Sequence, residues 1–140
     1  MSQTERNRAL VLEYMDAFAT FDPDRYFPYL AENPTYIAGA NVRQGRAAFK
    51  ANTDAGILLY PHPEKASNEL MAVLADGDWV AVLLRRRAVT NKVDDYENIY
   101  TMFYEIKDGK IVTQVEMLDF RVSAEKFDLS VLPQNRGQEG

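Results

Sequence analysis

Apolar residues recur every three or four positions in the first part of the chain. This spacing predicts an amphipathic helix across residues 4–21, with Thr4 in the position of its N-cap. The residues that define its apolar face are Leu10, Tyr14, Ala17, Phe18 and Phe21. A short second helix is predicted to begin at Asp22, because Asp is a favoured cap and Pro23 fits the first helical position. Asn33 and Pro34 are expected to end it.

Residues 35–42 predict a brief strand or turn, and a third helix is predicted across residues 45–60. This segment is rich in strong helix formers. Its apolar positions are Ala47, Phe49, Ala51 and Ile57. The segment Pro61-His62-Pro63 cannot continue a helix, because proline lacks the backbone donor and restricts the residue before it. We expect the chain to change from helix to sheet here.

The second half of the chain alternates in the manner of β-strands. The predicted strands span residues 66–74, 79–90, 96–106 and 111–120. Gly77 and Gly109 lie where tight hairpin turns require positive φ, so neighbouring strands are expected to be antiparallel. Three helices followed by a four-stranded meander indicate the α+β class, with helices on one face of a curved sheet.

The length and composition are those of one ordinary globular domain. With 140 residues, 46% hydrophobic and 26% charged, the chain is predicted to form a single domain across residues 1–128. Residues 129–140 are polar and contain proline and glycine, which predicts a loose C-terminal tail.

Charge and residue content exclude several classes of function. The net charge of −5 argues against a nucleic-acid partner, because nucleic-acid binding needs a basic face. The chain has no cysteine, and His62 is its only histidine, while phosphate-loop, nucleophile-elbow and zinc motifs are absent from the sequence. We therefore expect no metal and no cofactor. The N-terminus lacks the pattern of a signal peptide, and no apolar run reaches membrane-spanning length, so we expect a cytoplasmic protein without a membrane partner.

A carboxylate interrupts the last apolar strand. Side chains alternate along a strand, so Glu116 shares a face with Leu118, whereas Asp119 points to the other face unless a bulge intervenes. On the preceding strand one face carries rings with polar tips: Tyr96, Asn98, Tyr100, Met102 and Tyr104. Such a face suits an amphipathic pocket.

Glu116 beside Tyr100 and Asn98 is the candidate site for chemistry. An apolar pocket raises the pKa of a carboxyl group, which can then donate or accept a proton near neutral pH. Phenol groups nearby can orient a substrate or stabilise an oxyanion. The alternative is that Glu116 is half exposed at a strand end and pairs with solvent or with an arginine of the run 85–87. Arginines in that run alternate sides, so at least one faces inward, although a solvated sheet end also explains the run.

Several motifs of the second half resemble the SnoaL-like branch of the nuclear transport factor 2-like superfamily. They are Tyr96-x-Asn98-x-Tyr100, Phe103, Asp108 to Ile111, and Glu116-x-x-Asp119. The helix "LEYMDAF", the segment "LAENPTYIA" and the helix "QGRAAF" match in order, so the resemblance covers about residues 5–125. It implies a conical domain, in which three N-terminal helices pack on a curved, mainly antiparallel sheet that encloses a pocket. It also implies a homodimer formed through the sheet.

The branch contains enzymes of several kinds as well as noncatalytic binders, so the fold selects no single reaction. Similarity to the ketosteroid isomerases makes Tyr14 the oxyanion-side tyrosine, while their base aspartate falls near Ala38. Similarity to the limonene-type epoxide hydrolases makes Tyr36 the water-positioning tyrosine and places Glu116 where an aspartate is expected. Similarity to the phenazine biosynthesis proteins is functionally the nearest, and there Glu116 matches the acid/base glutamate.

The sequence therefore favours a cofactor-independent acid/base enzyme, such as an isomerase, dehydratase or cyclase, acting on a small hydrophobic substrate. Glu116 is the expected proton shuttle. The other candidate catalytic residues are Tyr36, Arg86 (by strand parity) and Asp119, and the candidate substrate contacts are Tyr14, Phe18, His62, Asn98, Tyr100, Met102 and Leu118. For His62, in a loop between prolines, a surface side chain is the alternative. A limonene-type epoxide hydrolase and a noncatalytic binder of small hydrophobes are the alternative functions.

Overall fold

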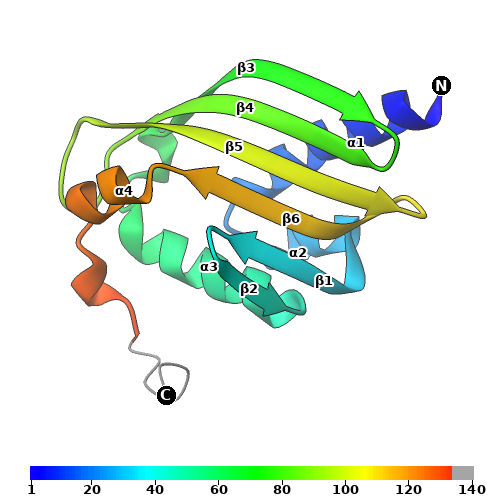
Figure 1. The fold of residues 1–140 in the computed structure, drawn as a ribbon. Helices are drawn as coiled ribbons and strands as arrows, with labels where there is room; N and C mark the ends of the chain where they lie inside the picture. The colour runs from blue at the N-terminus through cyan, green and yellow to red at the C-terminus, as the bar shows by residue number, and fades with distance from the viewer. Residues whose placement is uncertain (134–140) are drawn as a thin grey trace.

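The computed structural model describes residues 1–133 and has a six-stranded sheet covered by helices on one face (Figure 1). The helices are α1 (Gln3–Phe18), α2 (Pro23–Tyr26), α3 (Arg46–Leu59) and α4 (Phe120–Lys126), with 3₁₀ turns at Phe27–Tyr29, Pro63–Lys65 and Leu129–Val131. The strands are β1 (Leu30–Ala38), β2 (Asn41–Gln44), β3 (Ser67–Asp76), β4 (Trp79–Ala88), β5 (Tyr96–Lys107) and β6 (Lys110–Leu118). The α+β class is as predicted.

The strand order is β2-β1-β6-β5-β4-β3. Strands β3 to β6 form the predicted antiparallel meander, and the turn glycines Gly77 and Gly109 have φ of 57° and 73°. Strand β1 returns the chain to the other edge of β6 and pairs with it in parallel. The sheet is therefore mixed and larger than the predicted four strands.

The second helix is much shorter than predicted. Asp22 caps it as expected, accepting from the backbone of Asp24, but it ends at Tyr26. The segment through Asn33 and Pro34 belongs to β1 instead of ending a helix. The register with β6 shifts between Leu30 and Thr35, around the proline that cannot donate a ladder hydrogen bond. Pairing with β6, which lies some eighty residues away in sequence, decides this segment's structure.

Two other helix predictions need correction. The N-cap of α1 is Ser2 rather than Thr4, since the Ser2 hydroxyl accepts from the backbone N–H of Glu5 at 3.1 Å. Helix α3 buries Ala48, Phe49, Thr53 and Gly56, whereas the predicted core residue Ile57 is 52% exposed. The helix is therefore rotated relative to the face expected from sequence.

The C-terminal part contains a helix that the sequence did not indicate. Strand β6 ends at Leu118, and α4 follows directly, beside the beginning of β5 (Figure 1). The predicted tail begins with the turn Leu129–Val131, and the part at 134–140 lies outside the described residues. Within residues 1–133, no helix has both the length and the apolar character needed to cross a membrane.

Candidate functional site

A cavity of about 250 Å³ lies between the inner face of the sheet and helices α1, α3 and α4. Its apolar lining includes Met15, Phe18, Phe21, Leu59, Leu84, Met102, Leu118, Phe120 and Phe127. Its polar lining consists of Asn52, Tyr60, Asn68, Arg86, Tyr100, Tyr104, Glu116 and Ser123. Three larger surface grooves, of about 620, 500 and 270 Å³, contain neither Glu116 nor Arg86. This cavity is therefore where apolar surface meets Glu116 and Arg86.

Glu116 reaches this cavity from the last part of β6, two residues before the strand ends at Leu118, and lies opposite Met102 of β5. The Tyr36 hydroxyl donates to Glu116 Oε2 at 3.0 Å. Burial raises the pKa of Glu116 above its ordinary value, although the Tyr36 hydrogen bond and the charges of Arg86 and Arg43 act in the opposite direction. The alternative in which an arginine of the run 85–87 pairs with Glu116 is wrong, because Glu116 is only partly exposed, lines the cavity and forms no ion pair within residues 1–133.

Two predicted site tyrosines lie behind the cavity wall. Tyr36 is 0% exposed and packs its ring against Phe49, with ring centroids 5.0 Å apart. Tyr14 is also fully buried, and its hydroxyl donates to Gln114 Oε1 at 2.5 Å. Tyr36 therefore acts on Glu116 directly, whereas Tyr14 holds Gln114, the residue two positions before Glu116 on the same strand face.

Tyr100 supplies a phenol group to the cavity from β5. Its hydroxyl lies 2.7 Å from that of Tyr96, which in turn lies 3.1 Å from Ser123 Oγ. Burial raises the pKa of Tyr100 well above its ordinary value, so the phenol stays protonated and can donate. Asn98 does not line the cavity. Its side-chain amide donates to the Tyr96 hydroxyl and to the carbonyl of Asp119, both at 3.1 Å, and so ties β5 to the start of α4.

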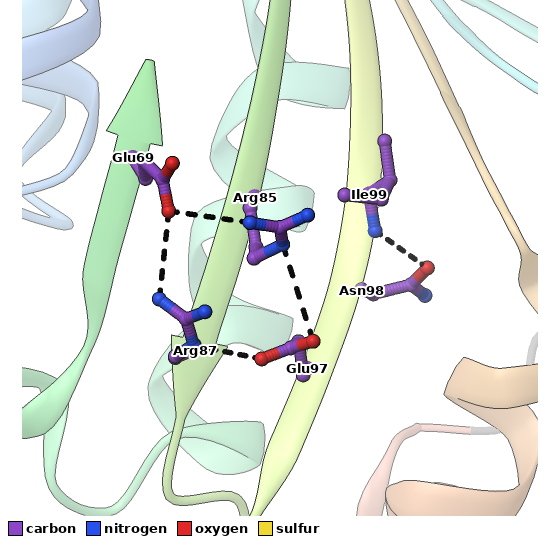
Figure 2. Close-up of polar contacts among 6 residues, drawn as sticks. All are labelled: Glu69, Arg85, Arg87, Glu97, Asn98 and Ile99. Carbon is purple, nitrogen blue, oxygen red and sulfur yellow. Dashed lines mark hydrogen bonds and ion pairs between the residues drawn. The ribbon is translucent and has the colours of Figure 1, made fainter. Parts of the chain in front are cut away.

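Arg86 is the arginine of the triplet that lines the cavity, in agreement with strand parity. Its guanidinium carbon lies 4.8 Å from the centroid of the Tyr60 ring. Its Nη1 donates to Asn68 Oδ1 at 3.4 Å. Arg85 and Arg87 occupy the other face, where both pair with carboxylates of β3 and β5 (Figure 2).

Phe18, Met102 and Leu118 line the cavity as predicted, but two other predicted residues do not. Asp119 is the N-cap of α4, and its Oδ1 accepts from the backbone N–H of Arg121 at 3.0 Å and of Val122 at 3.3 Å. The strand has ended at this point, so strand alternation no longer directs the side chain. His62 lies outside the cavity lining, in the loop before the Pro63–Lys65 turn, with Nδ1 3.5 Å from the Glu64 carboxylate.

Sequence reasoning missed four polar lining residues: Asn52, Tyr60, Asn68 and Ser123. For Asn52 a signal existed, because it shares a face with Gly56 and Leu59 at helical spacing. For Asn68 the signal was its register position opposite Arg86 in the β3–β4 hairpin. Ser123 belongs to the unpredicted α4, and Tyr60 follows the end of α3.

Residues 11–114 match the SnoaL-like domain family. A protein of Jannaschia sp. CCS1, provisionally named a SnoaL-like polyketide cyclase, superposes with a TM-score of 0.78 at 16% identity over 95% of this chain and 98% of that one. Bal32a, from a soil-derived mobile gene cassette, gives 0.77 at 19% identity over 91% and 100% of the two chains. A protein of Kribbella flavida DSM 17836, provisionally named a ketosteroid isomerase, gives 0.67 at 23% identity over 84% and 81%. At these identities the likeness shows the fold alone. No curated protein matches the chain.

Proposed function

The chain belongs to the SnoaL-like domain family and has the nuclear transport factor 2-like fold, and from this premise we propose that it is a cofactor-independent acid/base enzyme. Its substrate is a small hydrophobic molecule, and Glu116 is the proton shuttle. The observation that carries the proposal is a carboxyl group on the wall of a largely apolar cavity, with a pKa raised by burial.

The contacts of Glu116 support a role in proton transfer. Tyr36 occupies Oε2, so Oε1 is the oxygen left to meet a substrate. A carboxylate in this position can remove a proton from a carbon next to a carbonyl group, and the resulting carboxylic acid can return that proton to another carbon. This sequence is an isomerisation, and it is balanced without a further reactant. If the acid instead protonates a departing hydroxyl group, the products are an alkene and water.

The proton removal leaves negative charge on the substrate's carbonyl oxygen, and Tyr100 can stabilise it. Its phenol group lines the cavity on the strand next to that of Glu116. Because Tyr96 and Ser123 continue the hydrogen-bond chain, the phenol is held in place before the reaction, as electrostatic stabilisation of an oxyanion requires.

The alternative of a limonene-type epoxide hydrolase has less support. The resemblance of the chain to these hydrolases implies that Tyr36 positions the attacking water. The Tyr36 side chain, however, has no exposed surface and does not line the cavity. The alternative of a noncatalytic binder differs from the enzyme in that it binds its ligand without converting it, and an exchange measurement detects this difference.

Deuterium exchange tests the proposal without knowledge of the natural reaction. Cyclic ketones such as β-tetralone, incubated in D₂O with the protein, exchange their acidic C–H groups, and NMR measures the rate. We expect the wild type to accelerate exchange and Glu116→Gln to lose about two to four orders of magnitude of that acceleration. Glu105→Gln is the matched control, because Glu105 lies on the opposite face of the sheet and bonds Thr113 at 2.9 Å.

Equal acceleration by wild type and Glu116→Gln would refute the role of Glu116. Saturable binding of these ketones without any exchange would indicate the noncatalytic binder instead. Circular dichroism of each variant checks that its fold is intact.

The predicted homodimer stays part of this proposal. Large hydrophobic side chains are exposed on the outer face of strands β3 to β6: Leu74, Trp79, Ile99, Phe103 and Met117. Beside them lies the cluster of Glu69, Arg85, Arg87 and Glu97 (Figure 2). Exposed apolar surface rimmed by charge is typical of protein interfaces. We therefore propose that a second copy of the chain covers this outer face.

A further inference from the structure

Arg86 differs from both of its sequence neighbours in having no carboxylate partner within residues 1–133. Arg87 Nε lies 2.7 Å from Glu97, and Arg85 Nη1 lies 3.4 Å from Glu69. Figure 2 shows both ion pairs. The ion pairs formed within residues 1–133 do not include Arg86. Two arginines of the triplet are thus neutralised on the outer face, and the third brings its charge to the cavity without an ion pair to any residue that the structure describes.

The hydrogen-bonding capacity of Arg86 is also largely unused. A guanidinium has five N–H donors and no acceptor. Nη1 makes one long bond of 3.4 Å to Asn68, and Nε is buried with no partner among the described residues. The Tyr60 ring lies against the guanidinium and offers its π face rather than an acceptor oxygen. Because Nε is closed off from the cavity, an anion inside the cavity would bind the other N–H groups of the guanidinium, which lines it.

Glu116 is not the anion that binds the Arg86 guanidinium. Its carboxyl group is bonded to Tyr36, and it enters the cavity at a different level of the sheet. Arg86 stands in register with Asn98, whereas Glu116 stands in register with Met102. These two levels are four residues apart along β5, or about 13 Å at 3.3 Å per residue. The long side chains shorten this gap, and a small molecule can bridge what remains.

Building on the proposed function, we propose that the substrate is a small hydrophobic carboxylic acid whose carboxylate binds Arg86 beside Asn68 and Tyr60. Its apolar body then lies over Leu84 and Leu118, which are in register on either side of Tyr100, and carries the reacting carbon toward Glu116. The cavity volume of about 250 Å³ is below the range of about 300–1,000 Å³ for drug-sized ligands, which limits the acid to a small one.

Paired acids and amides test this assignment by isothermal titration calorimetry. The probes are benzoate, cinnamate and β-naphthoate, each compared with its neutral amide at about pH 8, where the acids are fully charged. For the wild type we expect at least one acid to bind about tenfold or more tightly than its amide, since hydrogen bonds to a charged group are the stronger ones. Arg86→Met should abolish this preference, and Arg86→Lys should retain part of it.

Arg85→Met is the matched control, because it removes the same charge one residue away on the outer face, and it should keep the preference for acids. Retained binding of the amides by Arg86→Met shows that the cavity has formed. The proposal is overturned if the wild type binds acid and amide equally, if no acid binds up to its solubility limit, or if the preference survives in Arg86→Met.

The outcome is separable from that of the proposed function. Glu116→Gln should keep the preference for acids while losing deuterium exchange. A preference for acids without exchange in the wild type would refute the enzyme and leave the carboxylate site. Exchange on ketones without a preference for acids would refute the carboxylate site and leave the enzyme.

Discussion

Replacing Tyr36 with phenylalanine removes one hydroxyl group and leaves the ring in place. The ring remains packed against Phe49, so the change isolates the 3.0 Å hydrogen bond to Glu116 Oε2. A hydrogen bond to a charged group contributes about 1.5–3 kcal/mol, and one between neutral groups about 0.5–1.5 kcal/mol. The destabilisation by Tyr36→Phe should therefore depend on whether Glu116 is ionised.

The contribution of Glu116 to wild-type stability should decrease as the pH rises, because burial raises the pKa of this carboxyl group in the folded protein. The folded protein holds this proton more firmly than the unfolded chain, so the stability that protonation contributes is complete below about pH 4.5 and is lost as the pH rises through the folded pKa. In Tyr36→Phe the ionised carboxylate also lacks its donor. We expect a destabilisation about 1–1.5 kcal/mol larger at high than at low pH, the difference between the two hydrogen-bond classes.

Urea denaturation of wild type and variant, from about pH 5 to about pH 9 across the range where a raised carboxyl pKa falls, measures this difference. Tyr26→Phe is the matched control, because the buried Tyr26 hydroxyl bonds neutral partners, the carbonyl of Phe49 at 3.1 Å and the hydroxyl of Thr53. Its destabilisation should not change with pH. If the destabilisation by Tyr36→Phe is also independent of pH, ionisation of Glu116 does not change the strength of this hydrogen bond, and the electrostatic reasoning fails.

Three further changes test other parts of the structure. Glu116→Gln removes a buried carboxyl with a raised pKa, so its stability relative to wild type should increase as the pH rises above about 4.5; parallel curves in thermal denaturation would contradict burial of the charge. Asp119→Ala should lower the free energy of unfolding by about 0.5–2 kcal/mol through loss of the α4 cap, while Asp119→Asn should not, and loss of deuterium exchange in both would restore a catalytic role. Phe103→Glu should convert a dimer to a monomer in light scattering, since Phe103 is 39% exposed on the outer face; a monomeric wild type would refute the interface.

The parts of the fold that depend on local pattern were predictable. Alternation and glycine turns specify the meander, because each hairpin closes within a few residues. The strand at the segment around Pro34 was not predictable, because it pairs with β6, which is distant in sequence. A proline in the sequence also suggests the end of a regular element. Helix α4 was missed because the apolar run through Met117 and Leu118 extends the strand pattern, and Asp119 gives a cap signal only once the strand is known to end there.

The same distinction applies to the candidate site. Strand parity placed Glu116 and Arg86 on the inner face, and both line the cavity. The resemblance to the limonene-type epoxide hydrolases does not show how deeply a side chain is buried, so Tyr36 was expected to contact a substrate or water, although it lies behind the lining and bonds Glu116. Tyr60 could not be found from pattern, because its place against Arg86 depends on how α3 lies across the sheet.

The sequence alone thus determined the order of helices and meander strands and the presence of one carboxyl group on an apolar, tyrosine-rich strand face. These are local properties, since the side of a strand on which a residue lies depends only on its parity. Tertiary structure alone decided which side chains reach the cavity, which arginines pair with carboxylates, and how strongly Glu116 is desolvated. Those properties depend on distances between segments far apart in the chain, and packing sets them only when the helices close over the sheet.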